Sequence, residues 1–290
     1  MTKNSRKLRR ILPFILVITL TLLVIACVIF ILTDTREPQK FATAEEVESE
    51  TEHMGAVRET GGITVKPRWE SVEKSELDES LFAWKDGIAS YPGASLGVDV
   101  SSHQREIDWA AAAKGGIRFA VVRLGYRGYT EGGLFEDEYF RRNAEGAGKN
   151  GIELGVYFFS QAVDEQEARE EAQFVLAALE GIETSVGIFF DWETITNDFA
   201  RTDTVELDTV TAMARAFCDE IIAAGRTAGV YFNINQLGYA YDLDELSDVK
   251  FWLAEYAGAP SYAYHTDMWQ FSAAGSIPGI SANVDLDLMW

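Results

Sequence analysis

Short apolar runs alternate with longer amphipathic stretches from position 96 to the C-terminus. Apolar runs of this length are typical of buried strands, and an apolar period of 3.6 residues is typical of helices. The pattern predicts helices over 107–114, 136–150, 164–180 and 205–224, each followed directly by a glycine that can end it. It predicts eight strands, over 96–100, 119–124, 152–159, 186–191, 228–233, 249–255, 268–271 and 284–288.

The order of these elements predicts a barrel. Strands that alternate with helices form parallel sheets with right-handed crossovers, and eight of them suggest closure. Positions 96–290 hold 195 residues, whereas a full (β/α)-barrel typically has about 250. Beyond position 249 the chain leaves no room for full helices. We therefore predict an α/β fold, an incomplete (β/α)-barrel of eight strands with about five helices, whose later strands are joined by loops.

A second apolar pattern lies near the N-terminus, where the 22 residues at 11–32 carry no charge. A helix of that length spans about 33 Å and matches the hydrocarbon core of a membrane. Five basic residues precede it, which predicts a cytoplasmic basic segment over 1–10, a single transmembrane helix over 11–32 and an outer location for the rest. A cleaved signal peptide and lipidation of Cys27 are the alternatives. Both are disfavoured because the run is long and stays apolar after Cys27.

The stretch at 33–80 is rich in glutamate and has few large apolar residues before Trp69. Such a stretch cannot bury enough surface to offset its ordering entropy, and like charges keep it extended. We interpret it as an acidic extracellular stalk, and we place the barrel domain at 81–290.

Charge and metal-binding residue types exclude several classes of function. The net charge of −21 over 290 residues argues against nucleic acid as a partner. The two cysteines, Cys27 and Cys218, lie in the apolar segment and in a predicted helix, so no disulfide is expected. The three histidines are far apart in the chain, and we predict neither a metal nor a cofactor.

The strand at 186–191 ends in two carboxylates, Asp191 and Glu193, with one residue between them. On a strand these side chains lie on one face, with Cα atoms about 6.6 Å apart. A pair of carboxyl groups at such a spacing can flank one scissile glycosidic bond. The simpler interpretation is a solvated strand end, where acidic residues are common.

Further polar and aromatic residues fall at the ends of the other predicted strands. In a parallel barrel these ends meet at one rim, which is where active sites lie. Acids together with flat aromatic rings are typical of a carbohydrate site. The residues concerned are Asp99, Tyr126, Tyr157, Phe159, Tyr231, Trp252, Tyr256, Trp269, Gln270, Asp285 and Asp287.

Several of these segments together resemble the glycoside hydrolase family 25 muramidases, the Chalaropsis-type lysozymes. The resemblance starts at Gly97-Val98-Asp99-Val100-Ser101-Ser102 and runs in order to the C-terminus. It includes Gly155-Val156-Tyr157-Phe158-Phe159, Asp191-Trp192-Glu193, Trp252-Leu253-Ala254-Glu255-Tyr256, Trp269-Gln270 and Asn283-Val284-Asp285-Leu286-Asp287. Phe158 and His103 depart from the family pattern, which affects the shape of the sugar subsites but leaves the acids in place.

The resemblance implies hydrolysis of the β-1,4 bond between N-acetylmuramic acid and N-acetylglucosamine in peptidoglycan, with no metal or cofactor. It implies that Glu193 is the general acid/base and that Asp191 orients the 2-acetamido group of the substrate or stabilises positive charge, which leads to retention. Asp99 and Asp285 line the same site. We expect a raised pKa at Glu193 and an ionised Asp191.

The same resemblance implies that glycan strands of peptidoglycan are the partner, while the apolar segment at 11–32 and its basic flank predict that the chain is held at a bacterial cell membrane. Tyr126, Tyr157, Phe159, Tyr231, Trp252, Tyr256, Trp269 and Gln270 are the predicted substrate-binding residues. Two alternatives remain: a catalytically inactive wall-binding protein, and a barrel glycosidase of chitinase type. The second lacks its expected D-x-x-D-x-D-x-E strand here, because 185–190 holds no acid.

Overall fold

A computed structural model of the chain describes residues 56–290, apart from 60–61, 66–68, 197, 235 and 237–239. The predicted basic segment at 1–10, the transmembrane helix at 11–32, Cys27 and most of the stalk lie outside the described residues. Within those residues, no helix has both the length and the apolarity that crossing a membrane requires.

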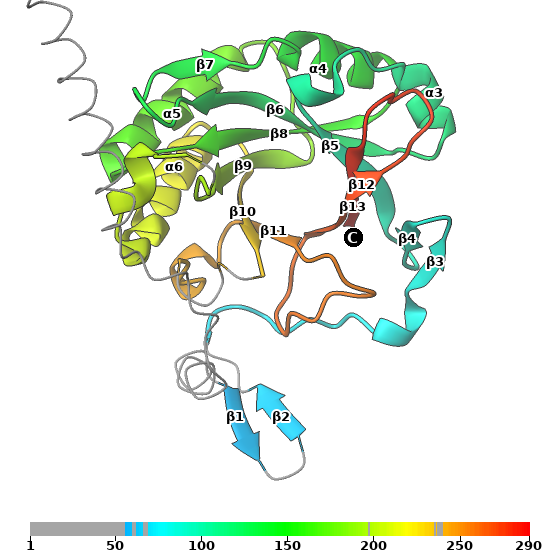
Figure 1. Ribbon diagram of the computed structural model, residues 1–290, viewed down its shortest axis with the longest axis horizontal. Coiled ribbons are helices and arrows are strands. Elements are labelled where there is room, and N and C mark those ends of the chain that lie inside the picture. Colours follow the sequence, from blue (N-terminus) through cyan, green and yellow to red (C-terminus); the bar gives the residue numbers. More distant parts are fainter. Residues whose placement is uncertain (1–55, 60–61, 66–68, 197, 235, 237–239) are drawn as a thin grey trace, which may run out of the picture. The chain divides into compact units, whose positions relative to one another are not determined.

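Eight strands form a closed barrel, as predicted (Figure 1). Neighbouring strands pair in the order β5-β13-β12-β11-β10-β9-β8-β6, and pairing of β5 with β6 closes the ring. The strands are β5 (Ser95–Val100), β6 (Phe119–Arg127), β8 (Glu153–Ser160), β9 (Gly187–Trp192), β10 (Ala228–Asn233), β11 (Lys250–Ala254), β12 (Met268–Gly275) and β13 (Val284–Met289).

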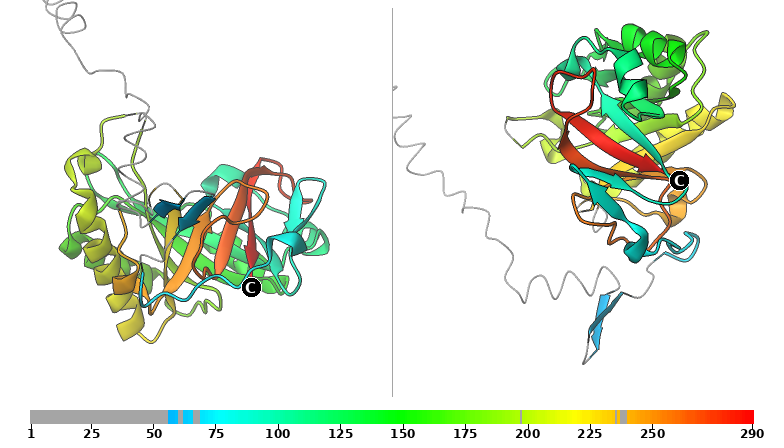
Figure 2. Two further views of the ribbon diagram at one scale, coloured as in Figure 1. Left: turned by 90° about the horizontal axis from the view of Figure 1, so that it is seen from below. Right: turned by 90° about the vertical axis from the view of Figure 1, so that its right-hand side faces the viewer.

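The last strand, β13, runs antiparallel to both of its neighbours, whereas the other pairs within the ring are parallel. Only eight residues, 276–283, separate β12 from β13. A parallel crossover needs about a dozen residues or more, so the chain has to turn back. The expectation that all eight strands end at one rim is therefore wrong for β13, whose first residues lie there. Figure 2 shows β13, in red, beside β5.

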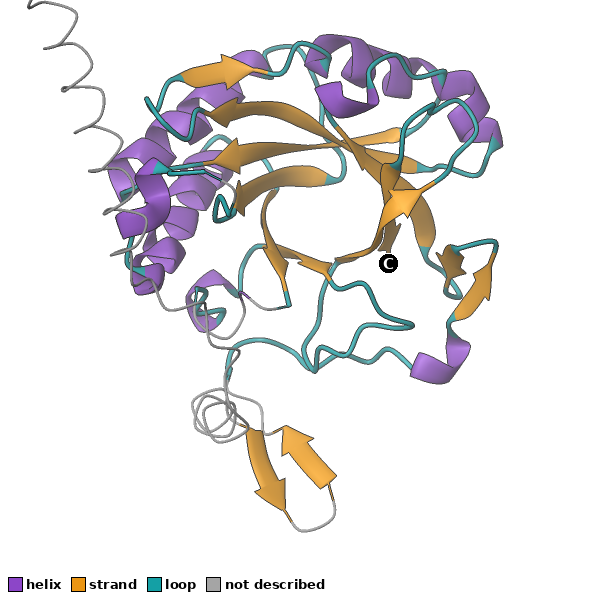
Figure 3. Ribbon diagram, viewed as in Figure 1, coloured by secondary structure: helices purple, strands orange, loops and turns teal. Residues whose placement is uncertain are grey.

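Four α-helices occur in the described part of the chain, one fewer than the predicted number of about five. Asp108 and Asp164 cap two of them, since each side chain accepts a hydrogen bond from a backbone N–H in the first turn. The helices lie outside one part of the barrel, and loops join the later strands (Figure 3). They are α3 (Trp109–Lys114), α4 (Phe140–Lys149), α5 (Glu165–Ala178) and α6 (Val210–Ala223).

Two hydrophobic cores hold the barrel together. The larger one lies between the outer face of the sheet and the helices, where Phe190 packs on Phe217 of α6. The smaller one fills the barrel interior and includes Phe119, Phe189 and Trp252. Because side chains alternate along each strand, the residues that share a face with Phe189 point into the barrel.

The barrel domain starts before the predicted boundary at 81. Trp69 and Val72 are buried, and the Trp69 backbone N–H donates to the Tyr264 hydroxyl at 2.8 Å. Residues 69–76 follow the loop before β12, with backbone hydrogen bonds from Ser75 to Ala263 and from His265 to Glu73. The boundary of the barrel domain therefore lies near Trp69, because the buried side chains of Trp69 and Val72 attach this acidic segment to the domain.

Short strands that the apolar pattern did not predict complete the structure. β7 (Leu134–Glu136) pairs antiparallel with β6, and β3 (Ala83–Lys85) pairs with β4 (Ile88–Ser90). β1 (Ala56–Glu59) and β2 (Gly62–Val65) form a further hairpin. Strands of three or four residues are too short to show a clear period in the sequence.

Replacing Gly97 by alanine is expected to destabilise the barrel by about 1–3 kcal/mol. A Cβ at Gly97 would lie 2.3 Å from the Phe119 ring, which is fully buried in the barrel interior. Urea unfolding measures the effect. Gly148→Ala in α4 is the matched control, because a Cβ there meets nothing within 4 Å, and it should stabilise the helix slightly. Equal unfolding midpoints for the two variants would contradict the expectation.

Candidate active site

Acidic side chains from three strands meet at one end of the barrel. Asp191 lies near the carboxyl end of β9 and Glu193 just beyond it. Asp99, near the end of β5, is the direct register partner of Asp285, near the start of β13. The charges of Asp285 and Asp191 both raise the pKa of Asp99. The charge of Asp285 also raises the pKa of Glu193. The structure thus brings together the four predicted catalytic acids.

Asp191 and Glu193 are in direct contact. The two carboxyl groups lie close enough to shift each other's pKa, through charge and a hydrogen bond between their side chains. Asp191 is 5% exposed, and its Oδ1 is buried with no hydrogen-bond partner among the described residues. The shared face predicted from the sequence is confirmed.

Burial is the largest influence on the pKa of both carboxyl groups of the pair. Burial raises the pKa of Asp191, the charge of Glu193 raises it further, and Arg123 lowers it in part. Burial also raises the pKa of Glu193, while its hydrogen bond with Asp191 opposes the increase. The raised pKa expected for Glu193 is confirmed. Burial disfavours the charged form of Asp191, which differs from the expected ionised Asp191.

A second acidic cluster lies next to the pair. Gln270 Nε2 donates to Asp99 Oδ2 at 2.8 Å, and Gln270 Oε1 accepts hydrogen bonds from the hydroxyls of Tyr231 and Tyr256 at 3.2 and 2.9 Å. Burial is the main cause of the raised pKa values of Asp99 and Asp285. The pKa of Asp285 rises to about 6. Gln270 therefore fixes the orientation of Asp99 through one side chain with three partners.

Asp287 does not reach the rim. It is fully buried, pairs with Gly97 one step deeper than Asp285, and accepts a hydrogen bond from Trp252 Nε1 at 2.9 Å. Because β13 is antiparallel to β5, later residues on β13 lie farther from the rim. The prediction that Asp287 lies at the rim with the other acids is therefore wrong.

Arg123 is the cation closest to the acids. Its guanidinium donates to Asp137 Oδ2 at 2.9 Å and to Ser102 Oγ at 3.0 Å. Asp137 is almost fully buried, so this ion pair is shielded from solvent. Sequence reasoning did not select Asp137, which precedes α4 and gave no signal of contact with β6.

The predicted aromatic residues fall into three groups. Tyr231 and Trp252 are buried beneath the acids, with ring centroids 4.8 Å apart. Tyr126, Tyr157 and Phe159 are half-buried on the inner face. Tyr256 is 62% exposed at the rim. Only the last two groups are accessible enough to contact a ligand directly.

Trp269 is not part of the site. It lies on the outer face of β12, where it packs edge-on against Phe82 and Trp84 and donates from Nε1 to the Glu255 carbonyl at 2.7 Å. Adjacent strand residues point to opposite faces, so Trp269 and Gln270 cannot both face the interior. Its predicted substrate-binding role is wrong.

Two glutamine side chains hold the backbone at Trp192 and Glu193, where β9 ends. Gln161 Nε2 donates to the Glu193 carbonyl at 2.7 Å, and Gln236 Nε2 donates to the Trp192 carbonyl at 2.9 Å. The Trp192 indole N–H donates to the Ala162 carbonyl at 3.1 Å. A strand end normally leaves such groups to solvent, so these bonds fix the position of Glu193.

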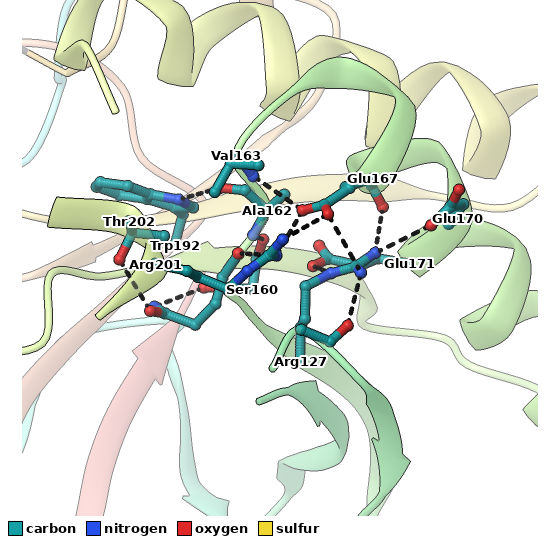
Figure 4. Close-up of polar contacts among 12 residues, drawn as sticks. Arg127, Ser160, Ala162, Val163, Glu167, Glu170, Glu171, Trp192, Arg201 and Thr202 are labelled. Atoms are coloured by element: carbon teal, nitrogen blue, oxygen red, sulfur yellow. Dashed lines mark hydrogen bonds and ion pairs between the residues drawn. The ribbon is translucent and has the colours of Figure 1, made fainter. Parts of the chain in front are cut away.

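A network of polar side chains that includes Arg201, Thr202 and Glu167 supports Gln161, and Figure 4 labels these three residues. Thr202 Oγ1 donates to Gln161 Oε1, and Arg201 donates to the Gln161 carbonyl, each at 3.0 Å. Arg201 also pairs with both carboxylate oxygens of Glu167 on α5, at 2.6 Å each. The network ties the segment after Glu193 to α5, and no pattern in the sequence predicted it.

Stability is expected to fall as pH rises from 5 to 8. The pKa of Asp285 rises to about 6 and that of Glu171, a buried α5 residue, to about 7, both mainly through burial. A folded-state pKa above the unfolded value means that stability is greatest below the unfolded pKa and is lost as pH rises through the folded pKa. Because one pKa unit corresponds to about 1.4 kcal/mol, the total loss is on the order of a few kcal/mol.

Thermal unfolding in dilute buffer measures this loss. Asp287→Asn should reduce the loss of stability between pH 5 and pH 8, because burial also raises the pKa of Asp287 well above its usual range. Glu180→Gln, at an exposed site, should leave the slope unchanged. A melting temperature that is the same at pH 5 and pH 8 would refute the expectation.

Comparison with known proteins relates this site to a family. The sequence model of the family described as glycosyl hydrolases family 25 matches residues 98–280, from β5 to the loop before β13. The autolytic lysozyme of Clostridium acetobutylicum is 26% identical over 193 residues, which cover 66% of this chain and 54% of that protein. The chain thus spans about half the length of the curated relative that it matches.

Solved structures show the same fold. The modular autolysin LytC of Streptococcus pneumoniae, in complex with a synthetic peptidoglycan ligand, has a TM-score of 0.60 at 24% identity and covers 72% of this chain and 52% of its own. A family 25 glycosyl hydrolase from Bacillus anthracis has a TM-score of 0.57 at 21% identity and covers 68% of this chain and 88% of its own. The barrel and its antiparallel last strand are thus the scaffold that carries the acids.

Proposed function

Because the chain belongs to glycosyl hydrolase family 25, we propose that it is a peptidoglycan N-acetylmuramidase, which cleaves the β-1,4 bond between N-acetylmuramic acid and N-acetylglucosamine. The observation that carries the proposal is the contact between Asp191 and Glu193, buried at the rim of a barrel that the family matches over 98–280. Two carboxyl groups, one protonated and one ionised, supply both an acid and an anion to a glycosidic bond.

Glu193 is the general acid in this proposal. Its carboxyl proton passes to the glycosidic oxygen as the bond from that oxygen to the anomeric carbon breaks. Glu193 then takes a proton from the water that attacks the anomeric carbon, and this restores the carboxylic acid. Gln161 keeps the main chain of Glu193 in place during both steps.

The acetamido oxygen of the substrate, rather than Asp191, attacks the anomeric carbon. An enzyme nucleophile and its acid partner stand about 5 Å apart on opposite sides of the sugar, whereas Asp191 and Glu193 are hydrogen-bonded to each other. Asp191 can instead accept the acetamido N–H and stabilise the positive oxazolinium ion. That hydrogen bond favours ionised Asp191 and leaves the proton on Glu193.

The chain acts from the outer side of a bacterial membrane, with 1–10 in the cytoplasm and 11–32 as the anchor. The charge of −21 opposes approach to an anionic wall. A membrane tether compensates for this by raising the local concentration of the enzyme at its substrate. Resistance to carbonate extraction, together with protease accessibility of the barrel in spheroplasts, tests this arrangement.

Product analysis tests the activity. The full-length protein in detergent is incubated with purified peptidoglycan, and the new reducing ends are reduced with borohydride and identified. Reduced N-acetylmuramic acid supports the proposal. Reduced N-acetylglucosamine would indicate another bond specificity, and wall binding without release would indicate an inactive wall-binding protein.

A further inference from the structure

A row of aromatic residues leads away from Asp191 across the sheet. Asp191 on β9 is the register partner of Phe159 on β8, Phe159 is the partner of Tyr126 on β6, and Tyr126 is the partner of Phe135 on β7. Register partners point to the same face of a sheet. The row therefore extends the inner face beyond the ring of eight strands, over three strand spacings or roughly 14 Å.

Two local features of β6 create this row. A β-bulge between Arg123 and Gly125 shifts the register, so that Tyr126 shares a face with Arg123 instead of the opposite one. Gly125 lets β7 approach, since a Cβ there would lie 2.3 Å from the Phe135 carbonyl oxygen. Neither feature is needed to close the barrel, which is completed by pairing of β5 with 119–122 of β6.

Exposure rises along the row. Asp191 is buried, Phe159 and Tyr126 are half-buried, and Phe135 is 50% exposed. The rings of Tyr126 and Phe135 are stacked, with centroids 5.4 Å apart and an angle of 27° between the planes. Arg123 lies over the Tyr126 ring, 5.5 Å from its centroid. The result is an ordered apolar surface that solvent reaches at its outer end.

The chemistry of the row differs from that of the acids beside it. Phe159, Tyr126 and Phe135 carry no charge, and the acids lie at the inner end of the row, where Asp191 is the register partner of Phe159. Aromatic rings bind the apolar faces of sugar rings, and the hydroxyl of Tyr126 offers a hydrogen bond to their polar edges. The apolar faces of sugar rings therefore fit this surface.

We propose that Phe159, Tyr126 and Phe135 bind the sugars of a glycan strand on one side of the scissile bond, with Phe159 nearest to the cut and Phe135 farthest from it. The inference rests on the proposed function, and it assigns Phe135 on β7 as the outer contact. A glycan strand long enough to reach Phe135 binds more tightly than a short oligomer, so the enzyme has a higher kcat/KM for long glycan strands.

Chain-length dependence tests this selection. Peptide-free oligomers of alternating N-acetylglucosamine and N-acetylmuramic acid, with four and with ten sugars, are hydrolysed by the full-length protein in detergent. Phe135→Ala should lower kcat/KM for the ten-sugar oligomer roughly three- to tenfold, through KM, and should lower the long-to-short ratio of kcat/KM. Phe135→Trp, which keeps an aromatic ring, should restore the ratio. Ile222→Ala, an exposed apolar residue on α6, is the matched control and should leave both substrates unchanged.

A fall of equal size on both oligomers, or no fall on the longer one, would overturn the inference. The inference would also be overturned if the chain forms a dimer that Phe135→Ala disrupts while kcat/KM for both glycan oligomers stays unchanged. If the wild-type protein hydrolyses neither oligomer, the proposed function fails separately. Calorimetry then measures how tightly the ten-sugar oligomer binds to the Glu193→Gln protein, with and without Phe135→Ala. Weaker binding by the double variant supports the inference that the aromatic row binds glycan, and equal binding overturns it.

Discussion

Replacing Glu193 by glutamine is expected to lower the rate of peptidoglycan hydrolysis by about a thousandfold or more, with little change in KM. Glutamine has nearly the same shape, and its side-chain amide can still contact Asp191. It cannot give a proton to the leaving oxygen or take one from water. The main-chain contact of Glu193 with Gln161 does not depend on the side chain, so the site should keep its geometry.

The measurement is the release of reducing ends from purified peptidoglycan, together with the thermal unfolding curve of the variant. Glu255→Gln is the matched control, because Glu255 follows β11 at the same rim and its carboxylate accepts hydrogen bonds from the backbone N–H and the hydroxyl of Ser261. That control should retain wild-type activity. Full lytic activity in Glu193→Gln, with an unchanged fold, would remove Glu193 from the mechanism.

Much of the barrel could be predicted because local pattern and fold agree. The apolar runs placed all eight barrel strands within a few residues of their observed bounds. Strand alternation could also have separated Trp269 from Gln270, since adjacent residues face opposite sides. Selecting both for the site overlooked that rule. The short link between β12 and β13 could likewise have predicted an antiparallel last strand, and with it the depth of Asp287.

Other features depend on contacts between distant parts of the chain. Gln161 and Gln236 reach the end of β9 from separate loops, and Arg201 reaches Glu167 across the network behind it. The sequence carries no period or motif for such contacts. The bulge in β6 is similar, because it shifts Tyr126 to the inner face against simple alternation. These long-range features are what position Glu193 and create the aromatic row.

Asp191→Asn is expected to lower kcat by about a hundredfold to a thousandfold, whereas Asp287→Asn should lower it less than about tenfold. Asparagine at 191 can still hydrogen-bond to the substrate acetamide, but it has no charge to balance the oxazolinium ion. It also removes the carboxyl partner whose hydrogen bond opposes the rise in the pKa of Glu193. At 287, asparagine keeps an oxygen that accepts from Trp252 Nε1, and that position is covered by the barrel interior.

The two variants differ most clearly when activity and stability are measured together. At pH 8, Asp287→Asn should raise the melting temperature, because it removes a buried carboxyl group whose pKa is raised by burial. Asp191→Asn should lose activity at every pH, since neutral asparagine cannot be ionised. If Asp287→Asn were as inactive as Asp191→Asn while remaining folded, the deeper Asp287 would have to take part in charge stabilisation. The division between rim acids that act on substrate and a deeper acid that supports them would then be wrong.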